Sequence, residues 1–219
     1  MEQGTLKEKA YTTIKKKIIE CEYLPGAVLS ENELMKEIGS SRTPIREALN
    51  RLEQEDLVKI VPKRGIWVSE LTTGMIYNIY EVRILLEPYV IREYGSEMAA
   101  ETLEEIKKLC EELVNNKQEN VLQYDMDTSE RLHVYLLGVC KNAFITNLVK
   151  NVYDQNYRMG TLVAGNREER FFESQKEHIN IINCILKKEY EKAADMLAKH
   201  LVKSRNEGIE LMMKNLQWK

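Results

Sequence analysis

The fold is decided by residues 41–49, which read Ser-Arg-Thr-Pro-Ile-Arg-Glu-Ala-Leu. We expect a helix to begin here, with the Thr43 hydroxyl as its N-cap and Pro44 at the first helical position, where a missing N–H costs nothing. Arg42 and Arg46 would then lie at the N-terminal end of this helix. A helix that enters the DNA major groove end-on can use arginines there, because guanidinium groups bind guanine edges and phosphates. The alternative is a capped helix whose two arginines are merely solvated.

A second short helix is expected just upstream. Residues 30–33 read Ser-Glu-Asn-Glu, a capping box in which Ser30 and Glu33 satisfy each other's backbone N–H groups. Apolar residues follow on one face, and Gly39 ends the helix. Two helices joined by so tight a connection predict a helix-turn-helix.

A β-hairpin is predicted after the second helix. Residues 57–61 and 66–68 are β-type runs, and the segment 62–65, Pro-Lys-Arg-Gly, supplies a basic turn between them. An amphipathic helix at 7–21 precedes these elements, so the N-terminal part is expected to be a winged helix. We expect Arg51 to share one basic face with the helix arginines and the wing.

Residues 8–69 resemble the DNA-binding domain of GntR-type bacterial transcription regulators. The motifs that carry the resemblance are Leu-Pro-Gly at 24–26, Leu-Ser-Glu at 29–31, the run at 41–49 and Pro-x-Arg-Gly at 62–65.

The resemblance implies a role for each matching position. Two arginines would contact bases or phosphates, Thr43 would contact phosphate, and the wing would approach the minor groove. Asn32 stands where many relatives have arginine, which alters one contact, and Asp56 stands where glycine is usual. The expected DNA-binding residues are Asn32, Arg42, Thr43, Arg46, Lys63, Arg64 and Gly65.

The overall charge does not decide whether the chain binds nucleic acid. The formal net charge is −3, and residues 1–72 carry 12 basic and 12 acidic side chains. A neutral domain can still bind DNA when its cations share one face, and such binding depends on salt.

The chain of 219 residues is long enough for two domains, and its character changes at 71–74. We expect residues 1–72 to bind DNA and residues 73–219 to form a helical domain that senses a ligand and dimerises. No run approaches the roughly 18 apolar residues of a membrane span, and the first ten residues are too polar for a signal peptide. We therefore expect a cytoplasmic protein with no membrane partner, whose four dispersed cysteines are reduced.

The second domain reads as helix after helix, so the fold class is mostly α, with an all-α bundle of six or seven helices. Pro88 falls inside the first of these helices and is expected to kink it or to mark a junction. The expected helices are 73–97, 100–117, 120–141, 144–164, 168–188 and 190–215.

All three histidines of the chain lie in this bundle, each on a separate expected helix. His133, His178 and His200 could meet in the core and present three nitrogens to a divalent metal, with positions left open for water or a ligand. Taken by spacing alone, three such histidines are more often unrelated core or surface residues.

The helical part resembles the FCD ligand-sensing domain of the FadR-like subgroup of the same family. The matching residues are Glu-Val-Arg-Ile-Leu-Leu-Glu at 81–87 and the surroundings of the three histidines. In many members, the histidines and an aspartate one turn before the first of them bind a metal, often zinc or nickel, which helps to hold a small carboxylate. The resemblance implies such a metal on His133, His178 and His200.

The aspartate of that pattern is missing here. Ser129 stands four residues before His133, and a neutral hydroxyl is a poor ligand. Glu130 is the candidate substitute, while Asp127 lies farther from the histidine face. Ser129 is expected to line the ligand site in either case. The alternative is a polar, hydrogen-bonded histidine core that binds the ligand directly.

Arg83 matches the arginine of the opening helix and is expected to pair with the carboxylate of an effector. The alternative is a structural ion pair with Glu87, four residues on.

The function expected from both parts is a homodimeric repressor that binds a short palindromic operator and responds to a small carboxylate. A regulator that answers to metal alone is the alternative. A zinc hydrolase is disfavoured, because the sequence shows no general base on a zinc motif and no nucleophile elbow.

Overall fold

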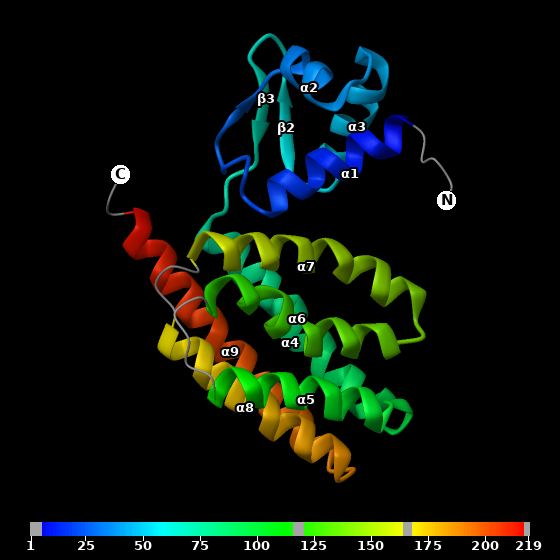
Figure 1. Cartoon of the computed structure of the whole chain (residues 1–219), viewed down its shortest axis with the longest axis vertical. Coiled ribbons are helices and arrows are strands. Elements are labelled where there is room, and N and C mark those ends of the chain that lie inside the picture. The colour runs from blue at the N-terminus through cyan, green and yellow to red at the C-terminus, as the bar shows by residue number, and fades with distance from the viewer. Residues whose placement is uncertain (1–5, 116–120, 164–167, 217–219) are drawn as a thin grey trace. The chain divides into compact units, whose positions relative to one another are not determined.

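The computed structural model describes residues 6–115, 121–163 and 168–216, and the side chains at 121–129, 163, 168–169 and 215–216 lie outside this description. The chain divides into two compact units, Met1–Leu71 and Thr72–Lys219. The fold is mostly helical, with a winged helix-turn-helix followed by a helical bundle, which confirms the predicted class (Figure 1).

The first unit packs three helices against a small antiparallel sheet. Its core is apolar, with Ile14 and Ile18 buried together with Ile45, Leu49 and Leu52. The elements are α1 (Leu6–Ile19), β1 (Val28–Leu29), α2 (Glu31–Ile38), α3 (Arg42–Gln54), β2 (Val58–Val61) and β3 (Gly65–Val68).

The sheet contains one strand that the sequence did not predict. Its order is β1-β3-β2, and β1 pairs with the outer edge of β3 through Val28 opposite Trp67. A strand of two residues has no periodicity to detect, and only its pairing with β3 makes it a strand.

The helix caps differ from the predicted ones. Ser30 is the N-cap of α2, but its side chain makes no capping hydrogen bond, so the capping box is not formed. Helix α3 begins at Arg42 with Ser41 as its N-cap, which places Thr43 and Pro44 inside the first turn. Proline is tolerated there because the N–H groups of the first turn have no partner within the helix.

Several tight turns of this unit use the left-handed backbone region. Gly39 ends α2 at φ 68°, and Gly65 closes the wing turn at φ 105°. Asp56, at the position where the resemblance led us to expect glycine, adopts φ 57°. Aspartate is among the few residues that enter this region readily.

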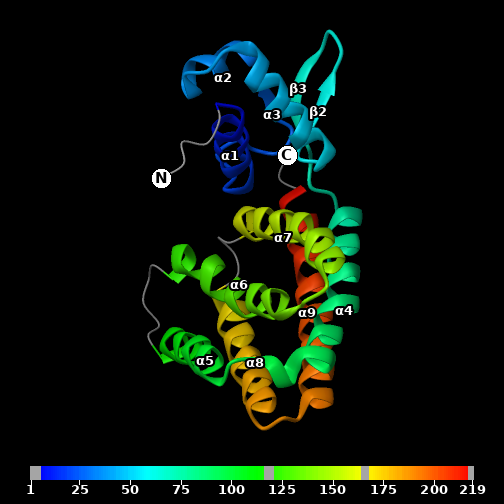
Figure 2. The same ribbon diagram turned by 90° about the vertical axis from the view of Figure 1, so that its right-hand side faces the viewer.

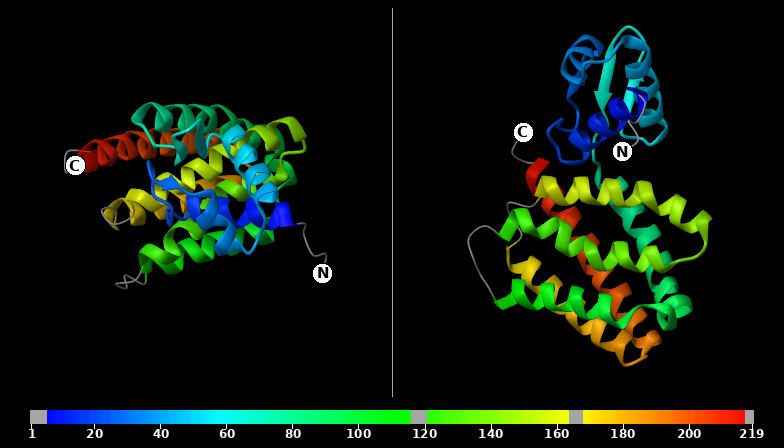
Figure 3. Two further views of the ribbon diagram at one scale, coloured as in Figure 1. Left: turned by 90° about the horizontal axis from the view of Figure 1, so that it is seen from above. Right: turned by 45° about the vertical axis from the view of Figure 1, so that its right-hand side comes forward.

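The second unit is a bundle of helices, in which α4 packs along α9 and α5 along α8 (Figure 2). Helix α6 lies between α5 and α7 (Figure 3). The helices are α4 (Thr73–Tyr94), α5 (Ala100–Asn115), α6 (Val121–Val139), α7 (Ala143–Val163), α8 (Glu168–Leu186) and α9 (Tyr190–Leu216), with the 3-10 turn η1 (Gly95–Glu97) after α4.

Pro88 does not mark a junction, since α4 continues through it to Tyr94. None of the described helices is long and apolar enough to cross a membrane.

Candidate functional site

The N-terminal end of α3 brings two of the predicted arginines together. The side chains of Arg42 and Arg46 are 56% and 60% exposed. Arg42 donates from Nη2 to Oδ1 of Asn32 over 3.2 Å, so Asn32 belongs to the same group. Thr43 is exposed beside them.

The wing residues lie apart from this group. Lys63, Arg64 and Gly65 are exposed at the turn between β2 and β3. Among the described contacts, none joins them to the α3 arginines. The unit therefore presents two separate basic features, a helix end and a hairpin tip.

Arg51, expected on the same basic face, contacts α1 in the structure. Its guanidinium lies 3.5 Å from the ring centroid of Tyr11 on α1, and Nη1 lies 3.2 Å from a carboxylate oxygen of Glu8. It ties α3 to α1 instead.

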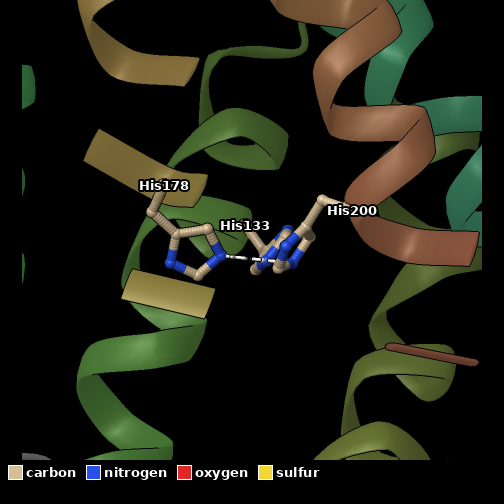
Figure 4. A group of neighbouring side chains, drawn as sticks. All are labelled: His133, His178 and His200. Atoms are coloured by element: carbon tan, nitrogen blue, oxygen red, sulfur yellow. Dashed lines mark hydrogen bonds between the residues drawn. The ribbon is translucent and has the colours of Figure 1, made fainter. Parts of the chain in front are cut away.

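The three histidines converge inside the bundle, each from a different helix (Figure 4). His133 lies on α6, His178 on α8 and His200 on α9, and all three are buried. The Nε2 atom of His178 lies 3.2 Å from Nε2 of His133 and 3.2 Å from Nε2 of His200. Spacing could place these residues on helices, but only helix packing brings their nitrogens together.

This geometry fits three ligands of one metal ion. With metal–nitrogen bonds of about 2.0–2.1 Å, neighbouring nitrogens are roughly 3.0 Å apart at right angles and 3.4 Å apart in a tetrahedron. The two distances of 3.2 Å from Nε2 of His178 lie between these values, and the ligand atoms of the three histidines all lie within 4.8 Å of one another. The three histidines are the cluster of potential metal ligands found among the described residues.

Two carboxylates orient the outer histidines. Glu87 Oε2 lies 2.5 Å from Nδ1 of His133, and Glu177 Oε2 lies 2.7 Å from Nδ1 of His200. A neutral ring that donates from Nδ1 turns a lone pair outward at Nε2, which is how metal-binding histidines are usually held. Sequence reasoning named Glu87 only as a partner of Arg83 and gave Glu177 no role.

Burial keeps the imidazoles of His178 and His200 neutral. Desolvation lowers the pKa of His178 well below its ordinary value and lowers the pKa of His200 to about 4, although Glu177 opposes the second shift. Because neutral imidazole is the form that binds metal, these two rings have the required protonation state at neutral pH. The chemistry of the donor set therefore fits a divalent transition metal.

Arg83 makes the structural ion pair with Glu87, and one of its other N–H donors has no partner among the described residues. Its Nε lies 2.6 Å from Oε1 of Glu87, and both side chains are buried. Its Nη2 is buried without a hydrogen-bond partner among the described residues. Both interpretations of Arg83 are thus compatible with the geometry, because Nε is paired with Glu87 while Nη2 has no partner among the described residues.

The role of Ser129, which stands at the position of the missing aspartate, stays a prediction. The Ser129 side chain, like that of Asp127, lies outside the described residues. Glu130 is described, and its Oε1 accepts from Nδ2 of Asn156 on α7 over 2.6 Å. Glu130 is not part of the histidine cluster.

Further buried polar atoms near this region escaped sequence reasoning. Gln175, three residues before His178 on α8, is fully buried, and neither its amide nitrogen nor its amide oxygen has a partner in the described structure. Tyr153 donates to Glu87 Oε1 over 2.6 Å. Nothing in the local sequence separates these residues from ordinary polar positions of a helix. Buried polar groups without partners are rare in proteins, and bound water or ligand commonly satisfies them.

Comparison with known proteins identifies both units. The family model described as bacterial regulatory proteins, gntR family, matches residues 6–68, and the FCD domain model matches residues 78–203. The HTH-type transcriptional regulator YdhC of Bacillus subtilis is 29% identical over 87% of this chain and 85% of its own. The HTH-type transcriptional repressor RspR of Escherichia coli is 22% identical over 96% of this chain and 92% of its own.

Solved structures share the fold. A GntR transcriptional regulator from Rhodococcus superposes with a TM-score of 0.79 at 19% identity, covering 93% of this chain and 97% of that one. A metal-free FCD domain of another regulator gives a TM-score of 0.58 at 24% identity, covering 67% of this chain and 99% of that one.

Proposed function

Because the chain belongs to the GntR family of bacterial regulatory proteins and carries an FCD domain, it is a DNA-binding transcription regulator. We propose that it is a dimeric repressor and that a small carboxylate releases it from its operator. The family is one of regulators and not of enzymes. Two relatives are named repressors, RspR and the gluconate operon repressor of Bacillus licheniformis.

The observation that carries the effector proposal is that Glu87 contacts both Arg83 and His133, and so brings a guanidinium close to the histidine cluster. This carboxylate contacts His133 on one side and Arg83 on the other, so the histidine cluster and the available Nη2 of Arg83 are close neighbours. A carboxylate can use a metal ion and a guanidinium together, because both favour anionic oxygen.

In this proposal His133, His178 and His200 hold a divalent metal, with zinc or nickel as the candidates. A bound metal would supply positive charge and open coordination positions for an anionic ligand. Ser129 and Arg83 contact that ligand. The free donor of Arg83 favours an organic anion over the alternative of a regulator that answers to metal alone, since metal binding would leave that donor unused.

The metal part of the proposal is tested by elemental mass spectrometry of protein purified without chelators. Wild type is expected to contain about one equivalent of transition metal per chain, and His178→Ala none. Small carboxylates are then screened by thermal shift, with and without metal. Absence of metal in wild type, even after zinc or nickel is added back, would refute this part.

The DNA part assigns base or phosphate contacts to Arg42 and Arg46, with Asn32, Thr43 and the wing residues Lys63, Arg64 and Gly65 at the flanks. Each of Arg42→Ala and Arg46→Ala is expected to cost about 1–3 kcal/mol at the operator, because a well-placed arginine contributes that much to base discrimination. Fluorescence anisotropy on an operator selected from a random duplex library measures the loss. Arg51→Ala is the matched control, since that arginine packs on α1. Full operator affinity in both α3 variants would show that this helix end does not read the operator.

A further inference from the structure

A single acidic side chain contacts both arginines at the N-terminal end of α3. Glu31, the first residue of α2, places Oε1 2.8 Å from Nε of Arg46 and Oε2 3.5 Å from Nε of Arg42. Its own side chain is 26% exposed, less than half the exposure of either arginine. Each oxygen of the carboxylate therefore faces one arginine, across the turn of the helix-turn-helix.

Glu31 contacts Arg46 only at Nε among the described contacts. Its Nε donates to Glu31, which leaves the two terminal nitrogens for outside partners. An arginine needs two parallel N–H groups to bind guanine O6 and N7 together. A guanidinium fixed at Nε still has such a pair and loses less side-chain entropy on binding, because part of its freedom is already gone.

A carboxylate is otherwise out of place on this surface. The surface is proposed to approach DNA, and a negative charge there is repelled by phosphates. Glu33, on the same first turn of α2, is exposed and makes no described contact with either arginine. The carboxylate of Glu31 thus contacts both arginines, whereas that of Glu33 has no described contact with either.

We infer that Glu31 is a positioning residue for operator recognition, which holds Arg42 and Arg46 in the orientation that reads bases. The inference rests on the proposed role of the two arginines. Glu31 itself touches no DNA in this scheme and acts through their guanidinium groups.

The same arrangement defines what Asn32 can offer. Its Oδ1 accepts from Arg42, so its amide N–H groups are what remain for DNA. A bidentate contact with adenine needs both the oxygen and the nitrogen of the amide. While Arg42 is held, Asn32 is a donor only and fits a base acceptor or a phosphate.

The opposite role for Glu31 is competition, in which the carboxylate occupies the arginines and must release them before DNA binds. The two roles predict opposite signs. Removal of a positioning group lowers operator affinity, whereas removal of a competitor raises it.

The experiment compares Glu31→Ala with Glu33→Ala in the full-length protein. Both variants lose one negative charge from the first turn of α2, so effects on the helix dipole and on general phosphate repulsion are matched. Affinity is measured by anisotropy for an operator selected by wild type from a random duplex library and for a scrambled duplex of equal length.

Glu31→Ala is expected to lower the operator-to-scrambled affinity ratio about tenfold, the order of one well-placed base contact. Glu33→Ala should leave the ratio unchanged, since lost repulsion acts on both duplexes alike. Thermal unfolding of both variants checks that the exposed substitutions leave the unit folded. An unchanged or raised ratio in Glu31→Ala would overturn the inference.

A double-mutant cycle separates positioning from an independent effect. In an Arg42→Ala/Arg46→Ala background, Glu31→Ala should not lower the ratio further, because the groups it orients are gone. A further tenfold fall there would also overturn the inference. If the arginine variants themselves kept full operator affinity, the proposed recognition helix would fail and the inference with it. If the arginine variants lose operator affinity but Glu31→Ala does not, the inference about Glu31 fails while the proposed recognition helix stands.

Discussion

Glu87 is the residue that links both halves of the proposed ligand site. Its buried carboxylate accepts hydrogen bonds from Arg83 and Tyr153 and meets the ring of His133. Burial alone would raise the pKa of Glu87, but the Arg83 guanidinium, the His133 ring and the hydrogen bond from Tyr153 together outweigh burial and hold the pKa well below its ordinary value. Glu177 has a similar role toward His200, with a pKa lowered to about 2, but its side chain is 30% exposed.

This difference in burial predicts different costs for the same substitution. Glu87→Gln leaves Arg83 charged and buried without its counter-ion, which is expected to lower the free energy of unfolding by about 3–5 kcal/mol. Glu177→Gln should weaken metal binding about 10–100-fold through its histidine with a much smaller loss of stability. Denaturant unfolding of metal-free protein and a competition titration with a chelating dye measure the two effects. Equal stability losses in both variants would contradict the assignment of Glu87 as a buried counter-ion.

At the scale of the element, the turn between α2 and α3 depends on a backbone that glycine provides. Gly39 has φ 68° and open space around it, so an added methyl group would meet no neighbour. Gly39→Ala is therefore expected to cost about 1 kcal/mol from conformation alone, and Gly39→Asn less, since asparagine tolerates the left-handed region.

The control is Gly74→Ala, in the first turn of α4, where no left-handed backbone is required. That substitution should be neutral or stabilise the helix by up to roughly 1 kcal/mol. Denaturant midpoints of the three variants decide the matter, and a neutral Gly39→Ala would show that the turn can adopt another conformation.

The helices were predictable because each buries a face that repeats with the helical period. The six helices described in the bundle were predicted within three residues of their observed ends. The N-cap of α3 was predicted two residues too late, at Thr43 and not at Ser41. Both residue types are good N-caps, and only the backbone angles distinguish them.

The site was predictable in composition but not in arrangement. The positions of His133, His178 and His200 could be read from the sequence, while their meeting depends on how α6, α8 and α9 pack. The contact of Glu31 with the arginines likewise depends on the angle between two helices, which no local pattern encodes.

At the scale of the whole molecule, α4 and α7 present apolar side chains that a single chain leaves uncovered. Leu85 is 67% exposed on α4, and Phe144 and Leu148 are 89% and 63% exposed on α7, a helix that packs against α4. Exposed apolar groups of this size commonly mark an interface. In the proposed dimer they meet a second copy of the chain.

The dimer prediction is tested by Leu85→Glu combined with Leu148→Glu. The double variant is expected to elute as a monomer in size-exclusion chromatography with light scattering, and to bind the operator more weakly because the two half-sites are no longer linked. Val134→Glu, at a 55% exposed position on α6, serves as the matched control and should remain dimeric. A dimeric double variant would place the interface elsewhere.

The all-imidazole donor set has a consequence for redox behaviour. Cysteine thiolates oxidise readily to sulfenic acids or disulfides, whereas histidine nitrogens do not take part in that chemistry. Cys110, Cys140 and Cys184 are buried and belong to no metal cluster in the described residues. In the proposed metal site, peroxide would therefore leave the three histidine ligands unmodified, whereas it would oxidise the thiolate ligands of a cysteine-based sensor in the same cell.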